Sequence, residues 1–164
     1  MALDAFLKIS TIDGESTKKG FEKQIELESF SWAVHQTTTM HSGTTGGSAG
    51  KAIVNDISFS KKVDKTSPIL LQNCLMGTHY KEIILSLRKV TGGVQMPFLI
   101  FTMNDCILSS YSTGGSHHSE ELSESMSINF ARIKMEYVVQ DAKGQATGKT
   151  TASWDITTGT KIGA

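Results

Sequence analysis

Cysteine and proline are both scarce in this sequence, which has two of each among its 164 residues. Cys74 and Cys106 stand among apolar neighbours, where a cysteine usually packs as a small hydrophobic side chain, so we expect buried thiols and no disulfide framework. A chain of this length can bury a core that holds without disulfides or metal ions, and no change of composition divides it. We therefore expect a single domain over residues 1–164.

An excess of either charge is also lacking, because 16 Lys and Arg residues balance 16 Asp and Glu residues. A neutral chain has no long-range field that would attract nucleic acid or an anionic membrane. No apolar run approaches the roughly 20 residues that a membrane-spanning helix needs. Residues 1–10 include Asp4 and no basic leader, which does not fit a secretory signal peptide. We expect neither nucleic-acid binding nor membrane insertion, and export only by a route without a cleaved signal.

Enzymatic motifs occur only without their usual context. Ser48 lies in a G-x-S-x-G pattern at residues 46–50, but a nucleophile elbow needs a helix after it, and here a predicted strand follows. Residues 148–150 resemble the end of a phosphate-binding loop with the wrong glycine spacing. His117 and His118 are adjacent, and adjacent side chains on a strand point to opposite faces. We therefore expect no enzyme, no cofactor and no metal site.

Helical signals are confined to one segment. Thr66 and Ser67 can cap a helix, Pro68 fits its first turn, and Gly77 supplies a stop. The apolar face expected between them consists of Ile69, Leu70, Cys74 and Leu75. This segment predicts one short α-helix.

Alternation with period two dominates the rest of the chain, which is the strand signature. Strands are expected at residues 3–9, 24–36, 52–60, 81–91, 97–110, 121–139 and 148–157. The apolar residues change parity near Glu28 and Ser29, and again around Arg132, so a β-bulge or sharp bend is expected at both places. Long strands that bend suit a cornered or closed barrel. The predicted fold class is a β-barrel of bent antiparallel strands with one short flanking α-helix.

Small uncharged residues occupy the other face of the two bent strands. Candidate residues of this face are Ser29, Ser31, Ser125 and Ser127. Freely solvated strand faces carry Lys, Glu and Thr more often. Two interpretations remain open, namely an ordinary wet surface, which tolerates serine, or a smooth polar wall that faces a channel or a cargo.

Residues 37–50 form a long segment without apolar periodicity and with several glycines. Loops of this length in a compact domain are usually functional or disordered. Met40 and His41 are the residues of this segment best suited to contact another protein surface. It is either a loop that packs on a neighbouring subunit or a flexible surface loop.

Short stretches in a fixed order extend over nearly the whole chain. They are MALDAFLKI at residues 1–9, DGES at 13–16, SFSW at 29–32, a Gly-rich loop ending in Gly50 and Lys51, ISFSK at 57–61, DKTSP at 64–68, STGGS at 112–116, and NF at 129–130 before MEY at 135–137. In these stretches the sequence is similar to the haemolysin-coregulated proteins, the Hcp family, which are tube subunits of bacterial type VI secretion systems.

The resemblance implies a β-barrel with a short helix, six copies that close into a ring, and rings that stack into a hollow tube. It also implies three partners besides further copies of the chain: the VgrG spike at the tip, a contractile sheath around the tube, and effector proteins carried in the lumen. The protein would be cytoplasmic before firing and would then be secreted without a cleaved signal peptide.

Site residues are carried over from the family by position. The loop at residues 37–50 corresponds to the family's extended loop, so its residues become candidates for contacts between subunits or rings. These candidates are Met40, His41, Ser42, Gly43, Gly46, Gly47 and Ser48. Ser31 lies opposite Phe30 and Trp32 by strand alternation and becomes the leading candidate for the lumen, with the other serines of its face.

Three other functions are compatible with parts of the pattern. A monomeric β-barrel that binds a small ligand or carbohydrate would use the polar faces, but seven Phe, three Tyr and two Trp leave few aromatic residues outside the core to line a site. A bacteriophage tail-tube protein shares the logic of stacked rings. A serine hydrolase would have to use Ser48.

Overall fold

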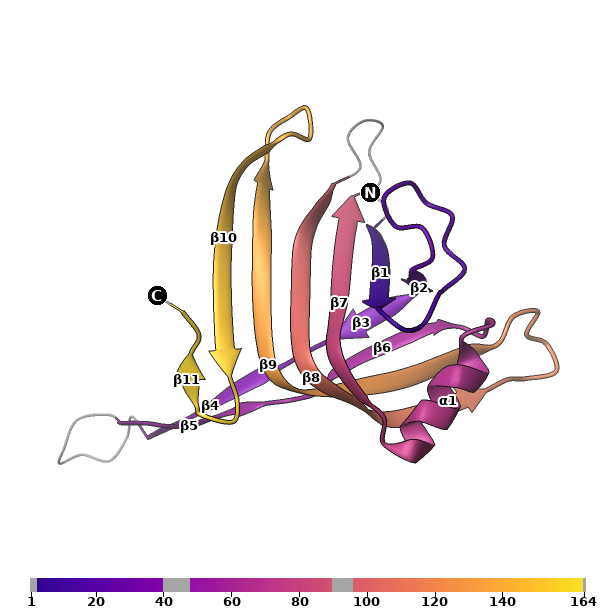
Figure 1. Ribbon diagram of the computed structural model, residues 1–164, viewed down its shortest axis with the longest axis horizontal. Helices are drawn as coiled ribbons and strands as arrows, with labels where there is room; N and C mark the ends of the chain where they lie inside the picture. The colour runs from indigo at the N-terminus through magenta and orange to yellow at the C-terminus, as the bar shows by residue number, and fades with distance from the viewer. Residues whose placement is uncertain (1–2, 40–47, 90–95, 164) are drawn as a thin grey trace.

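The computed structural model describes residues 3–39, 48–89 and 96–163. Strands dominate this part of the chain, with one helix among them (Figure 1). In chain order the elements are β1 (Leu3–Ile9), β2 (Ile25–Leu27), β3 (Ser29–Ser31), β4 (Val34–Thr39), β5 (Ser48–Val54), β6 (Ile57–Lys62), α1 (Ser67–Met76), β7 (His79–Lys89), β8 (Pro97–Gly114), β9 (Ser123–Gln140), β10 (Ala146–Asp155) and β11 (Thr160–Lys161). The predicted class, mainly β with one short helix, is confirmed.

The long strands β8 and β9 organise the fold, because they pair along almost their whole length and curve through two layers (Figure 1). Asp105 has a left-handed φ of 52°, and the register shifts between Leu108 and Ser110. Such irregularities bend a strand and increase its twist. As a result, one half of the β8–β9 pair lies with β7, β1 and β10, and the other half lies with β6 and β3.

The change of parity near Glu28 is a change of partner. Strand β2, before Glu28, pairs with β1, and β3, after it, pairs with β6. The Glu28 amide donates a hydrogen bond of 2.8 Å to the Ser60 carbonyl at the bend. Each pairing is only three residues long, so the two sheet edges approach each other through one bent segment. Nine of the described strands form a curved, open sheet, and β4 and β5 form a separate two-stranded sheet. The described strands therefore do not close completely into the predicted barrel.

The second predicted change of parity is confirmed within β9. Met126, Ile128 and Phe130 are buried before Arg132, and Ile133 is buried after it. The sequence prediction of single strands at residues 24–36 and 52–60 is too coarse, however. The first range contains β2, β3 and the start of β4, and the second contains the end of β5 and most of β6, because bends interrupt the pairing.

The core lies between the two layers. Its fully buried side chains include Ile25, Ile57, Leu85, Met103 and Ile128. No helix in the described residues has the length and apolar character to span a bilayer. Burial raises the pKa of the Cys106 thiol to about 12, so this thiol stays protonated. Cys74 is half-buried, and neither cysteine forms a disulfide within the described residues.

Helix α1 ends as predicted but begins differently. Gly77 has a left-handed φ of 62°, and its N–H donates to the Cys74 carbonyl. At the start, the Thr66 side chain caps no helix N–H among the described residues. Asp64 orders the turn before the helix instead, because its Oδ1 accepts hydrogen bonds from the Thr66 N–H and hydroxyl. The Ser67 hydroxyl is directed away from the helix end and into a buried cluster described below.

The apolar face predicted for α1 is half right. Leu70 is fully buried and Cys74 is half-buried, with its thiol donating to the Leu108 carbonyl at 3.5 Å. Ile69 and Leu75, however, are 45% and 80% exposed. The helix touches the sheet along the narrow line of positions four residues apart, so neighbouring apolar side chains point outward.

Candidate functional site

Serine occupies every position of two rows that cross the four strands β3, β6, β9 and β8. The register of the strands places these residues opposite one another in sequence. The first row is Ser29, Ser60, Ser125 and Ser112, and the second row is Ser31, Ser58, Ser127 and Ser110. All four serines predicted for the polar face belong to these serine rows, so the structure brings them together.

Hydroxyl groups within the serine rows bond to one another. The Oγ atoms of Ser29 and Ser60 are 2.6 Å apart, and those of Ser58 and Ser127 are 3.1 Å apart. The Ser110 hydroxyl also donates to Ser127 Oγ at 2.9 Å. These bonds connect hydroxyls of neighbouring strands across the rows. The rows form a neutral surface of short side chains.

The opposite face of the same strands belongs to the core. Phe59 and Met126 alternate with the serines and are nearly inaccessible to solvent. Phe30, between Ser29 and Ser31, packs against the ring of Phe101 at a centroid distance of 6.0 Å. The core therefore determines which way the serine rows face, since side chains of successive residues point to opposite sides of a strand.

Charged groups are found at the margins of the serine rows. At one margin, the Ser123 hydroxyl donates to Glu28 Oε2 at 3.1 Å. At the other, Asp56 accepts hydrogen bonds from Ser109 at 2.6 Å and from Asn129 at 2.8 Å. These partly paired groups leave the centre of the rows uncharged.

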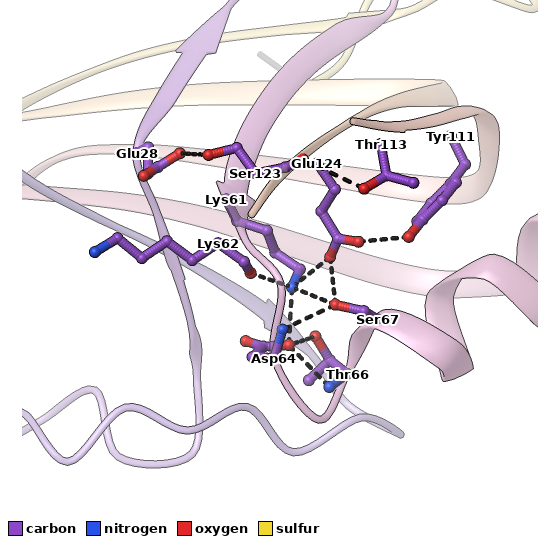
Figure 2. A network of polar contacts seen from close by, with 10 residues as sticks. All are labelled: Glu28, Lys61, Lys62, Asp64, Thr66, Ser67, Tyr111, Thr113, Ser123 and Glu124. Carbon is purple, nitrogen blue, oxygen red and sulfur yellow. Dashed lines mark hydrogen bonds and ion pairs between the residues drawn. The ribbon is translucent and has the colours of Figure 1, made fainter. Parts of the chain in front are cut away.

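A buried ion pair lies behind the serine rows, on the core side of β6 and β9 (Figure 2). Lys61 Nζ is 2.6 Å from Glu124 Oε1 and 2.8 Å from Asp64 Oδ1. The side chains of Lys61 and Glu124 are both 0% exposed. Lys61 also donates to the Lys62 carbonyl and to the Ser67 hydroxyl. Several acceptors therefore surround this single ammonium group.

Glu124 is held from several elements. Its Oε1 accepts the Ser67 hydroxyl at 2.6 Å, and its Oε2 accepts the Tyr111 hydroxyl at 2.6 Å (Figure 2). This hydrogen bond raises the pKa of Tyr111 to about 12. Burial favours the neutral form of Asp64, but hydrogen bonds from Lys61 and Thr66 outweigh it and lower the pKa of that carboxyl. The cluster joins β6, β8, β9 and the first residue of α1.

This cluster is built for anchoring rather than for chemistry. Every polar atom of Lys61 and Glu124 in Figure 2 is directed at a protein group. The pair lies in the core, and neither side chain has exposed surface where a substrate would meet it. Among the described residues, no group of His, Cys, Asp and Glu side chains has the geometry to hold a metal ion.

Most of the predicted contact residues fall outside the described residues. These are Met40, His41, Ser42, Gly43, Gly46 and Gly47. Ser48 is the first residue of β5 and pairs with Thr39 of β4. Strand β5, not a helix, follows Ser48, so the context of a nucleophile elbow is absent there. The β4–β5 ribbon projects from the body of the domain (Figure 1).

An apolar groove lies at the root of this ribbon and was not predicted. Its volume is about 340 Å³, and it is bounded by β4 and β5 on one side and by β9 and β10 on the other. The residues that define this ribbon groove are Trp32, Val34, Val54, Ile133, Met135 and Trp154. The Trp32 indole N–H donates a hydrogen bond of 2.9 Å to the Asn55 carbonyl, which holds the ring in place.

Sequence reasoning also missed half of the serine rows and the buried pair. A signal was present, since Ser58 and Ser60 alternate with buried residues as Ser29 and Ser31 do. Lys61 likewise continues the inward-facing positions of β6, which marks a buried lysine in need of a partner. The identity of that partner depends on the pairing of β6 with β9.

A family profile described as "Type VI secretion system effector, Hcp" matches residues 6–137. The chain belongs to the Hcp family. The family resemblance predicted from the sequence is thereby confirmed, and with it the assignment to the type VI secretion system. Members of this family are structural tube proteins.

Individual members of the Hcp family match over almost the full chain. Hcp1 of Pseudomonas aeruginosa is 40% identical over 148 residues, which cover 90% of this chain and 91% of that protein. The crystal structure of Hcp1 from Salmonella typhimurium has a TM-score of 0.81 and 36% identity, covering 99% of this chain and 100% of that one. A further structure, described as a type six secretion system protein, has a TM-score of 0.91 at 30% identity, covering 98% and 99%.

Proposed function

We propose that this chain is the structural subunit of a type VI secretion tube, in which six copies form a ring and rings stack into a hollow secreted tube. The observation that carries the proposal is the pair of serine rows, an uncharged wall on a sheet whose other face is core. Membership of the Hcp family supports the same role, and the number six follows the family resemblance.

The edges of the serine sheet explain how copies would join. Beyond the pairing of His79 with Ile107, the second half of β8 has no strand partner on its outer side among the described residues, and β3 pairs only with β6. Open edges of this kind pair readily with another chain. Neighbouring strands are antiparallel throughout, so β3 and β8 run in opposite directions. The β8 edge of one copy therefore fits the β3 edge of the next as an antiparallel pair.

Repetition of this contact would generate a closed wall. The contact uses two different edges of the same subunit, so it is heterologous, and heterologous contacts close into rings when the rotation between subunits permits. The serine rows of all copies then face the same way. We assign Ser29, Ser31, Ser125 and Ser127 to the lumen, together with the serines opposite them.

A neutral hydroxyl wall suits a cargo that must be held and then released. Short serine side chains offer many weak hydrogen bonds, and the main pockets of the described surface are lined by residues outside the serine rows. Effector proteins are the proposed cargo. The VgrG spike at the tip and the contractile sheath outside the tube are the remaining proposed partners, and the subunit would be cytoplasmic until firing exports it.

The projecting β4–β5 ribbon is the proposed contact between rings. It extends away from the serine sheet, so it can reach a copy that lies beyond the ring (Figure 1). The proposed contact residues remain the candidates from the sequence, which are Met40, His41, Ser42, Gly43, Gly46, Gly47 and Ser48. No catalytic role is assigned, since the serine of the G-x-S-x-G pattern begins a strand.

Electron microscopy of the purified protein tests the ring. We expect annular particles with a central hole, and native mass spectrometry should give a mass of six subunits. Contacts within a ring and contacts between stacked rings can differ in strength. Dilution should then dissociate the weaker contacts first, so we expect both single rings and short tubes. A protein that remains strictly monomeric at high concentration would contradict the proposal.

A further inference from the structure

Four large apolar side chains of α1 are exposed around the polar Gln72, which is unusual for a surface helix. Leu75 is 80% exposed, Met76 66%, Ile69 45% and Leu71 39%. The helix contains no charged residue at all. Surface helices normally present polar side chains to water, and exposed apolar patches mark surfaces that another molecule covers. We refer to these four side chains as the helix patch.

The ribbon groove is an apolar surface too. Val34 is 49% exposed and Met135 is 38% exposed at its mouth, and no charged side chain lines it. Helix α1 and the β4–β5 ribbon lie toward opposite ends of the domain's long axis (Figure 1). The helix patch therefore cannot fill the groove of its own subunit. A contact between them must join two copies.

The two surfaces lie beside the two open edges of the serine sheet. The helix is attached to the β8 edge, because Cys74 donates to the Leu108 carbonyl. The groove begins with Trp32, the residue directly after β3. Both surfaces are on the core side of the sheet, since Leu70 and the aromatic rings around Trp32 pack in the core. Joining a β8 edge to a β3 edge thus brings a helix patch toward a ribbon groove.

We propose that the helix patch of one copy packs into the ribbon groove of the next copy in the ring. This inference rests on the proposed function, and it identifies a second layer of contact outside the serine wall. The occupant is a second copy because patch and groove match in chemistry, are both free of charge, and adjoin complementary sheet edges. Two different surfaces in contact give each subunit a head and a tail, which a ring requires.

Cysteine cross-linking tests this contact directly. The background is Cys74→Ser, which removes the half-buried thiol of the helix and leaves the buried Cys106. Leu75→Cys and Ala152→Cys then place one thiol in the patch and one in the groove. Under mild oxidation we expect the chain with both changes to form a ladder on a denaturing gel. Mixed single variants should give only dimers, and either single variant alone should stay monomeric on the gel.

Charge substitution tests the same contact energetically. Leu75→Glu and Met135→Lys should each raise the concentration at which half of the rings dissociate by at least about tenfold, because each buries an unpaired charge in an apolar contact. The double variant should recover part of the loss. Leu3→Glu is the matched control, since Leu3 is 53% exposed on β1 and belongs to neither surface. Circular dichroism at low concentration checks that each variant folds.

The outcomes separate this inference from the proposed function. If the unchanged protein forms no rings, the proposed function and this contact both fail. If rings form but Leu75→Glu leaves them intact and no cross-link appears, the proposed function stands and this inference is overturned. The helix patch would then be open on the finished ring and accessible to a different protein.

Discussion

Removal of the ammonium group of Lys61 should destabilise the fold more than any other single lysine substitution in the described chain. Lys61→Met keeps the length and apolar volume of the side chain but deletes Nζ. Glu124 then loses a partner at 2.6 Å and Asp64 loses one at 2.8 Å, and Glu124 remains completely buried. Breaking a buried pair by removing one partner costs about 3–5 kcal/mol, because an uncompensated charge is left behind.

The expected loss is large compared with the stability of a typical domain, which is about 5–15 kcal/mol. Ser67 and Tyr111 still donate to Glu124 in the variant and limit the damage, so we expect about 3 kcal/mol, the lower end of the range. The double variant with Lys61→Met and Glu124→Gln removes both charges and should regain much of this loss. Its amide oxygen can still accept a hydrogen bond from Tyr111.

Urea unfolding at one fixed protein concentration measures these differences, since assembly would otherwise shift the midpoint. Lys62→Met is the matched control, because Lys62 is the next residue on β6, points to the other side and is 54% exposed in its ion pair with Glu121. Surface pairs contribute about 0–1 kcal/mol. Equal losses for Lys61→Met and Lys62→Met would refute the reasoning that the buried pair anchors the sheet.

Three further changes test separate features. Ser31→Glu should leave ring formation intact but impair retention of an effector in co-purification, with Ser31→Thr as the control; failure of the rings to form would show that Ser31 does not face the lumen. Asp64→Asn should be less stable than the unchanged protein at neutral pH. The pKa of Asp64 is lowered in the folded state, so its stabilisation is present above the unfolded pKa and is lost as the pH falls through the folded pKa, and urea midpoints should converge in acid. Convergence at alkaline pH instead would contradict this assignment. Gly77→Ala should cost about 1 kcal/mol in thermal or urea unfolding, because φ is 62° while a Cβ would meet no neighbour within 4 Å; an unchanged midpoint would show that the helix end adjusts at no cost.

Local patterns in the sequence were sufficient for the elements themselves. Pro68 and Gly77 delimit a helix through backbone geometry alone, which needs no tertiary partner. The parity changes near Glu28 and Arg132 located the bends, because alternation along a strand reports which side faces the core. The same alternation placed Ser31 on the face opposite Phe30 and Trp32.

The packing of the elements on one another decided which side of α1 is buried and how far the sheet closes. The apolar residues of α1 occur around most of the helix, so periodicity did not distinguish the inward Leu70 from the outward Leu75. The bent strands likewise predicted a barrel without distinguishing a cornered one from a closed one, because closure depends on how many residues pair at the last edge. Only three residues of β2 and three of β3 do so.

The sequence by itself therefore determined the class of fold, the position of the helix, the bends and the identity of individual serines as outward residues. Only the tertiary structure aligned the serines of four strands into rows and joined Lys61 to Glu124. The physical reason is the range of the interactions. Alternation and capping act between residues close in the chain, whereas the register of β6 on β9 brings together residues more than sixty positions apart, and only the packing of the whole core selects it.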